Sequence, residues 1–201
     1  AAGQRNQAAV ALVLEGRLLE RLARGEGPAD WQDLLGADAP ASLEDADQEA
    51  FDLYQRAVAE LEVEGPSLEL TRGLRRLAAW HAERNDAASA LEVELRIIEV
   101  HEALDEPRDQ AQAHFYVSWL AQELERLPLA RHHLDRAYAI FDQLDDRLGR
   151  AESLTSLAQV DAVEKGMWQE SSAWSRRSRS RQTALALGTT AAVTSRVESM
   201  K

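Results

Sequence analysis

The chain has 201 residues, of which 45% are hydrophobic, so it is long enough and apolar enough to form a folded core. Its formal net charge of -12 disfavours nonspecific binding to nucleic acid or to anionic membranes, and favours basic partners. It has no cysteine, which excludes disulfides and thiolate chemistry. Only five prolines and ten glycines indicate an all-α protein.

No stretch approaches the roughly 18 apolar residues that a membrane-spanning helix needs. No basic segment, apolar region and cleavage site follow one another near the start, so no signal peptide is predicted. We therefore expect a soluble, cytoplasmic protein. Because the chain starts at Ala1 and not at a methionine, we also expect it to be processed or excised from a longer protein.

The chain is predicted to form one domain (residues 1–201) made of successive helices in three segments. Residues 1–66 form an irregular N-terminal unit with an insertion at 25–41, residues 67–187 form regular helix pairs, and residues 188–201 form a partial helix. The predicted helices span residues 4–24, 42–63, 67–84, 87–104, 107–127, 128–144, 148–165 and 167–187, with a short one at 191–201.

The helix boundaries follow from capping and breaking residues. Ser42, three residues before a carboxylate, is typical of a helix N-cap, and Asp86 is expected to cap a later helix. Pro107 and Pro128 fit the first turn of a helix, where the missing N–H of proline is tolerated. Within the insertion, Trp31 is interpreted as a plug for an apolar surface.

Small and large residues recur along the chain with a period of about 40 residues, which is a length typical of helical repeats. In the second helix of each pair, the repeated sets are Ala50, Tyr54 and Ala57; Ala90, Glu94 and Ile97; Ala130, Leu134 and Ala137; and, with the shift one position longer, Ser171, Ser175 and Ser178. In the first helices they are Leu74, Leu77, Ala78 and His81; His114, Val117, Ser118 and Ala121; and Leu154, Leu157, Ala158 and Asp161. Such a period, with two helices each, predicts an α-solenoid of antiparallel helix pairs, each pair burying its remaining apolar face on the next.

This pattern resembles the tetratricopeptide repeat family, in a long variant with repeats of about 40 residues. The resemblance rests on Leu77-Ala78 with His81, on Asn85-Asp86, on Ala90-Leu91, and on the Gly-Met-Trp turn at residues 166–168. It implies a right-handed superhelix of helix pairs. The sequence departs from the family in the last-repeat serines, in Glu94 where an aromatic residue is common, and in the missing closing proline. HEAT-like or irregular helical packing is the competing fold.

No catalytic motif of the HExxH, P-loop, GxSxG or GxGxxG type is present, so we expect no enzymatic activity and no cofactor. The histidines are expected to bind no metal. His81 and His114 occupy helix-packing positions, and the adjacent His132 and His133 project about 100° apart on a helix. Four carboxylates are interpreted as a solvated face: Glu92, Glu94, Glu99 and Glu102.

In tetratricopeptide-like proteins the first helix of each pair, called helix A here, lines a concave surface that holds partner peptides. The resemblance implies the same surface here. Its partner-binding positions are Arg72, Arg75, Arg76, Gln112, Phe115, Tyr116, Trp119, Gln122, Glu152, Thr155 and Gln159. Aromatic residues and arginine are typical of binding hot spots. Because Phe115 and Tyr116 are adjacent, at least one of them is expected to lie in the core.

A second feature is an arginine- and serine-rich run at residues 171–181. Residues 168–201 carry a net charge of +4, so the rest of the chain carries -16. The arginines of this basic patch are Arg176, Arg177, Arg179 and Arg181. We interpret the patch as a solvated helix surface, with binding of phosphate, RNA or an acidic partner, or head-to-tail stacking of copies, as alternatives.

The sequence therefore predicts a non-enzymatic scaffold that binds a protein or peptide on its concave helix-A surface. One alternative is a sensor or regulatory segment of a larger signalling or transcription-regulating protein. A second is nucleic-acid or phosphate binding through the basic patch, which the overall charge disfavours. Homo-oligomers through the solenoid ends fit all three, because uncapped ends expose apolar surface.

Overall fold

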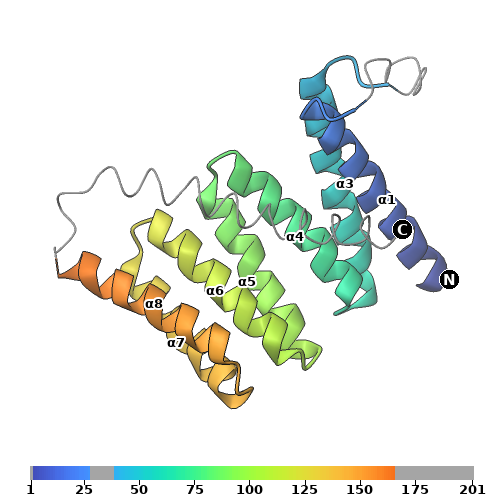
Figure 1. Cartoon of the computed structure of the whole chain (residues 1–201). Helices are drawn as coiled ribbons and strands as arrows, with labels where there is room; N and C mark the ends of the chain where they lie inside the picture. The colour runs from blue at the N-terminus through green and yellow to red at the C-terminus, as the bar shows by residue number, and fades with distance from the viewer. Residues whose placement is uncertain (1, 28–38, 166–201) are drawn as a thin grey trace, which may run out of the picture. The chain divides into compact units, whose positions relative to one another are not determined.

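The computed structural model describes residues 2–27 and 39–165, and in these ranges the chain forms α-helices and no strand (Figure 1). The helices are α1 (Ala2–Ala23), α3 (Leu43–Glu64), α4 (Leu68–Glu83), α5 (Ala87–Ala103), α6 (Pro107–Glu123), α7 (Leu127–Gln143) and α8 (Arg147–Glu164). The all-α class is confirmed for this part of the chain. Trp31 and the helices predicted at 167–187 and 191–201 lie outside it.

Four helix ends share one kind of turn, which recurs at a constant spacing along the chain. The left-handed residues of these turns, with φ from 51° to 59°, are Asn85, Asp105, Glu125 and Asp145. In each turn the following residue donates its N–H to the carbonyl five residues earlier, over 2.8–3.0 Å, which is the Schellman arrangement. Each repeat period of the sequence therefore contains two backbone units of equal length.

The predicted caps are confirmed. The side chains of Ser42 and Asp86 each accept a hydrogen bond from the backbone amide three residues later, at the starts of α3 and α5. Pro107 and Pro128 lie in the first turns of α6 and α7. These signals for helix starts were sufficient because each acts within one turn of the chain. The predicted end of the helix at 107–127 is wrong: α6 ends at Glu123, because the turn is set by the left-handed residue Glu125 and not by Pro128.

Consecutive helices pack against one another in chain order within the unit formed by Ala1–Val160 (Figure 1). The final helix of this series, α8, approaches α7 closely through Gly149, where an added Cβ would lie 2.4 Å from the Phe141 ring. Residues 161–201 form a second unit, of which only 161–165 are described. This sequential packing is that of a helical repeat.

The repeat register predicted from the sequence marks packing positions on α3 and α7, but on α8 two of the predicted positions, Leu154 and Ala158, are exposed among the described residues. Tyr54 on α3 and Leu134 on α7 occupy equivalent places in different units, and both are fully buried, with 0% exposure. The alanines that precede them by four residues, Ala50 and Ala130, are also fully buried. Glu94 holds the corresponding place on α5, so this register puts a carboxyl group where the other units carry core side chains.

Candidate functional site

The first helices of the pairs, α4, α6 and α8, carry the residues that the sequence predicts to bind a partner, and we call their shared surface the helix-A face. Four of these residues lie near one another in the structure. Their common point is the hydroxyl of Tyr116 on α6. Its pKa is affected by Arg75 of α4, Gln112 of α6 and Glu152 of α8. Residues predicted from three separate repeats therefore converge on one place.

The convergence point also contains two carboxylates. Arg75 lies 3.9 Å from an oxygen of Asp109 at the start of α6. Glu94 reaches the same place from α5, and its charge acts on Tyr116. We call Arg75, Glu94, Asp109, Gln112 and Tyr116 the Glu94 cluster.

Glu94 differs from the other carboxylates of its helix. Glu92, Glu99 and Glu102 are exposed, as the solvated-face interpretation predicts, but that interpretation is wrong for Glu94, which is half-buried. Burial raises the pKa of Glu94 to about 7, and the nearby Arg75 guanidinium opposes this rise. The reason is its register, which places its side chain between helices and not on the outer side of α5.

Tyr116 is half-buried beside Glu94. Burial raises the pKa of its hydroxyl, and the negative charge of Glu94 raises it further. Arg75 and a side-chain hydrogen bond with Gln112 act in the opposite direction. The phenol therefore stays protonated at neutral pH, and part of its side chain remains exposed.

The other predicted aromatic residues contribute to packing. Phe115 packs with Leu157 of α8 around a buried cluster that includes Leu134. Trp119 packs against the larger core cluster. This agrees with the expectation that Phe115 and Tyr116 face different directions, and it leaves Tyr116 as the aromatic residue of the Glu94 cluster.

The remaining predicted positions are spread along the helix-A face and do not join the cluster. Arg72 pairs with Glu69 of its own helix at 3.3 Å. Gln122 donates to the carbonyl of Ser118, and the hydroxyl of Thr155 donates to the carbonyl of Ala151. Gln159 is half-buried on α8. These bonds lie within single helices, so they leave no defined site at these positions.

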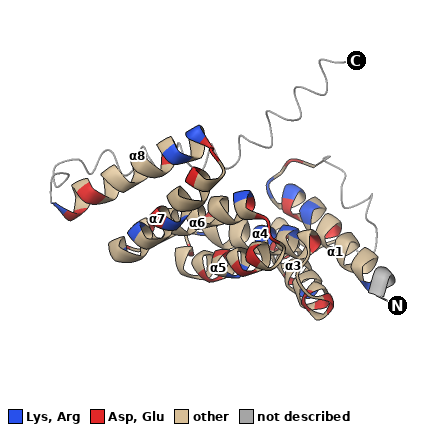
Figure 2. Ribbon diagram, turned by 90° about the horizontal axis from the view of Figure 1, so that it is seen from below, with Lys and Arg blue, Asp and Glu red and all other residues tan. Residues whose placement is uncertain are grey.

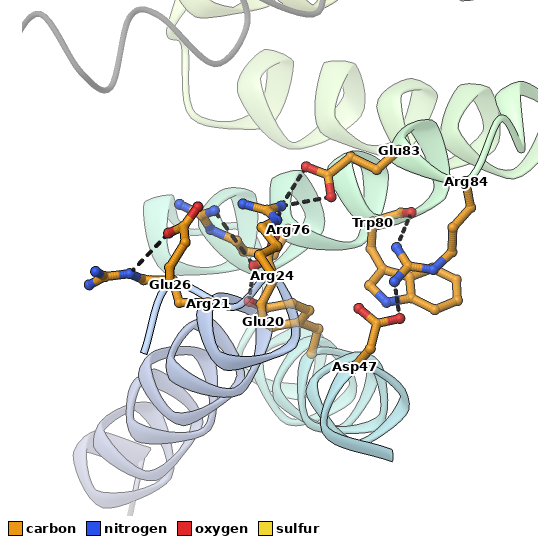
Figure 3. Close-up of polar contacts among 10 residues, drawn as sticks. Glu20, Arg21, Arg24, Glu26, Asp47, Arg76, Trp80, Glu83 and Arg84 are labelled. Atoms are coloured by element: carbon orange, nitrogen blue, oxygen red, sulfur yellow. Dashed lines mark hydrogen bonds and ion pairs between the residues drawn. The ribbon is translucent and has the colours of Figure 1, made fainter. Parts of the chain in front are cut away.

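Arg76, also predicted to face the partner, turns instead toward a buried carboxylate that the sequence analysis did not single out. Glu20 of α1 is only 5% exposed and accepts a hydrogen bond of 2.6 Å from the Tyr54 hydroxyl. Arg24 donates to Glu20 over 2.5 Å, and Arg76 lies 4.0 Å from it (Figure 3). This network joins α1, α3 and α4, and the only sequence signal for it was a tyrosine at a core register position.

A cavity of about 360 Å³ lies beside this network, lined by Ala23, Arg24, Leu43, Glu44, Asp47, Glu83 and Arg84. Four of its five charged side chains, those of Arg24, Asp47, Glu83 and Arg84, have partners within the protein. Arg84 lies 3.7 Å over the Trp80 ring and pairs with Asp47, and Arg24 pairs with Glu83 (Figure 3). Because these groups already neutralise one another, we regard the cavity as a structural junction of three helices and not as the binding site.

Two buried histidines join neighbouring helices. His114 of α6 and His133 of α7 are buried, with their Nδ1 atoms 2.8 Å apart, so one nitrogen donates and the other accepts. His81 contacts the Asp86 carboxylate at 3.1 Å, and His132 is exposed beside His133. Among the described residues, no group of three or more His, Asp or Glu side chains could hold a metal ion.

Charged side chains of both signs are spread over the described helices (Figure 2). The predicted basic patch at Arg176–Arg181 lies outside the described residues. In the ranges that the structure covers, no helix is long and apolar enough to cross a membrane.

Comparison with known proteins supports the fold and gives no function. No protein-family model and no curated protein sequence matches the chain. Among solved structures, the crystal structure of BtubC (BKLC) from P. vanneervenii is similar, with a TM-score of 0.52 and 17% sequence identity over 92% of each chain. At this identity the likeness shows the fold alone: the chain shares the overall arrangement of its helices with that protein.

Proposed function

We propose that the chain is a tetratricopeptide-like α-solenoid that acts as a non-enzymatic scaffold and binds a peptide or protein partner on its helix-A face. The observation that carries the proposal is the Glu94 cluster. Polar side chains and one aromatic ring from α4, α5 and α6 meet there, and Arg75 keeps a side-chain exposure of 45%. Arginine and tyrosine held in this way are typical anchors of a protein interface.

The rigidity of the helix pairs supports binding by pre-organisation. Each helix of 17 residues between α5 and α7 is fixed at its end by the same hydrogen-bonded turn, so the side chains of the cluster are carried by well-defined helices. Because the site is already ordered, binding a partner there costs less conformational entropy than binding on a flexible loop would. The regular spacing of these turns also supports the solenoid assignment.

Replacing Arg75 and Gln112 by alanine together is expected to weaken partner capture by roughly tenfold or more, because hot-spot side chains each contribute above about 1 kcal/mol. Both side chains extend outward from their helices, so the melting temperature should change little. Capture from a lysate of the source cells, quantified by mass spectrometry, measures the effect against wild type.

The matched control for this double variant is Arg136→Ala with Glu92→Ala, which removes two exposed side chains from the second helices α7 and α5. It should capture the partner as well as wild type does. Equal loss in both double variants would contradict a site on the helix-A face. Trp119 is left unchanged, because it packs against the core and its removal would disturb folding.

A further inference from the structure

We propose that Glu94 and Tyr116 receive a lysine or arginine side chain of the partner, at the junction of α4, α5 and α6. This inference rests on the proposed function and specifies its chemistry: the partner peptide is basic at the position that meets the Glu94 cluster. A comparison of this junction with the preceding one along the chain supports it.

The junction of α1, α3 and α4 contains a carboxylate, a phenol and guanidinium groups. There the buried Glu20 accepts a hydrogen bond of 2.6 Å from the Tyr54 hydroxyl. Its charge is balanced by Arg24 at 2.5 Å and Arg76 at 4.0 Å (Figure 3). A half-buried or buried carboxylate is costly unless it is paired, and here the chain itself provides the cations. The Glu20 carboxylate of this junction therefore needs no cation from outside the protein.

The junction of α4, α5 and α6 has the same kinds of groups in a different arrangement. Glu94 stands at the register position of Tyr54, and Tyr116 stands at that of Arg76, each one repeat period further along the chain. Because Tyr116 stands where the first junction has Arg76, the second junction has no cation at this register position. Among the described residues, no ion pair within 4 Å involves Glu94, and Arg75 lies 3.9 Å from Asp109 instead.

The charged groups around Glu94 and Tyr116 favour a cation over an anion. The charges of Glu94 and of Glu152 on α8 both act on the Tyr116 hydroxyl, whereas the nearby guanidinium of Arg75 lies 3.9 Å from the Asp109 carboxylate. His101 of α5 is buried nearby, and burial and Arg75 both lower its pKa, so it adds no positive charge at neutral pH. A phosphate or carboxylate ligand would meet a net negative site and be repelled.

The aromatic ring adds a second attraction. An ammonium or guanidinium within about 6 Å of a tyrosine ring is attracted by its electron-rich face. The protein already uses this combination inside the fold, since Arg84 lies 3.7 Å over Trp80 and pairs with Asp47. At the Glu94 cluster the carboxylate and the ring are present, and the cation would come from the partner.

Burial raises the pKa of Glu94 to about 7, and this supports the inference in a way that can be measured. A bound ammonium favours the ionised carboxylate, so binding at pH 6 requires Glu94 to release a proton. The affinity for a basic peptide should therefore rise between pH 5.5 and pH 8. Burial raises the pKa of the Tyr116 hydroxyl, so the phenol stays protonated in this range.

The test uses two immobilised libraries of ten-residue peptides with capped ends. One has a fixed central lysine among randomised non-acidic residues, and the other has norleucine at the centre, which keeps the side-chain length without the charge. Wild type at pH 7.5 should retain the lysine library roughly tenfold better or more, as expected for a charge-assisted hydrogen bond to a half-buried carboxylate. Glu94→Gln should lose this preference, and the control Glu92→Gln, exposed on the same helix, should keep it.

The outcomes separate the inference from the proposed function. Equal retention of both libraries by wild type, reduced by Arg75→Ala with Gln112→Ala, would leave the helix-A face as a binding surface and overturn the lysine site. A lysine preference unchanged in Glu94→Gln, or unchanged between pH 5.5 and pH 8, would also overturn it. Retention of neither library would count against both proposals.

Discussion

Acidification from pH 7 to pH 4 is expected to destabilise the fold through one buried pair, His114 and His133. Burial lowers the pKa of each imidazole to about 4, and for His114 the neighbouring His133 lowers it further. The positive charge of Arg136 and the proximity of His132 act in the same direction on both. In the unfolded chain each histidine titrates near 6.5.

The sign of the effect follows from proton binding. Between pH 6.5 and about 4 the unfolded chain binds protons that the folded pair does not bind. The contribution of the pair to the free energy of unfolding is therefore fully present above pH 6.5 and is lost as the pH falls through this window. The two groups titrate as a coupled pair, and their combined contribution is on the order of 4 kcal/mol. Urea unfolding at pH 7, 5.5 and 4 measures it.

The repeat register supplies the variant that isolates this effect. Other units carry Leu74 and Val93 at the places of His114 and His133, so the double variant His114→Leu with His133→Val uses residues that the repeat already accommodates. It should lose about 4 kcal/mol less stability than wild type between pH 7 and pH 4. The exposed His132 provides the control, because His132→Gln should remain about as acid-sensitive as wild type. A double variant that is equally acid-sensitive would contradict this assignment.

Replacing Glu94 by glutamine is expected to stabilise the protein at pH 8 and to have little effect at pH 5. Burial raises the pKa of Glu94 to about 7, above its unfolded value of 4.5. The folded state therefore holds a proton that the unfolded state releases, and the favourable contribution present below pH 4.5 is lost as the pH rises through 7. Its size is about 2 kcal/mol after allowance for partial exposure.

For a chain of this length, about 2 kcal/mol corresponds to a rise in Tm of roughly 4–8 °C at pH 8. Thermal unfolding of Glu94→Gln and of the exposed control Glu92→Gln at both pH values measures the difference, and the control should not change. A fall in Tm of Glu94→Gln at pH 8 would mean that Arg75 pairs with the Glu94 carboxylate inside the fold. The site would then be complete without a partner.

The sequence predicted those features of the fold that depend on neighbouring residues or on simple periodicity. Ser42 and Asp86 cap their helices within one turn, and Pro107 and Pro128 lie in the first turns of helices, so their effects are local. The repeat period located Tyr54 and Leu134 in the core because equivalent positions in a repeat meet equivalent neighbours.

The site was harder to predict because its properties depend on contacts between helices. The spacing of carboxylates along α5 did not separate Glu94 from its exposed neighbours. The repeat register did contain the signal, because the equivalent residues Tyr54 and Leu134 are buried. Glu20 and Arg24 meet Arg76 from a distant part of the chain, and an ion pair of that range leaves no periodic pattern. The direction of Phe115 relative to Tyr116 required the position of α8.

The central claim is that a partner occupies the helix-A face, and photo-crosslinking tests it most directly. The photoreactive residue p-benzoylphenylalanine would replace Gln112 on α6 in one protein and Arg136 on α7 in another, since both side chains are exposed. Irradiation in source-cell lysate should give a discrete adduct from position 112, none from position 136, and less from position 112 when Arg75→Ala is added. An adduct from position 136 alone would place the partner on the second helices and contradict the account.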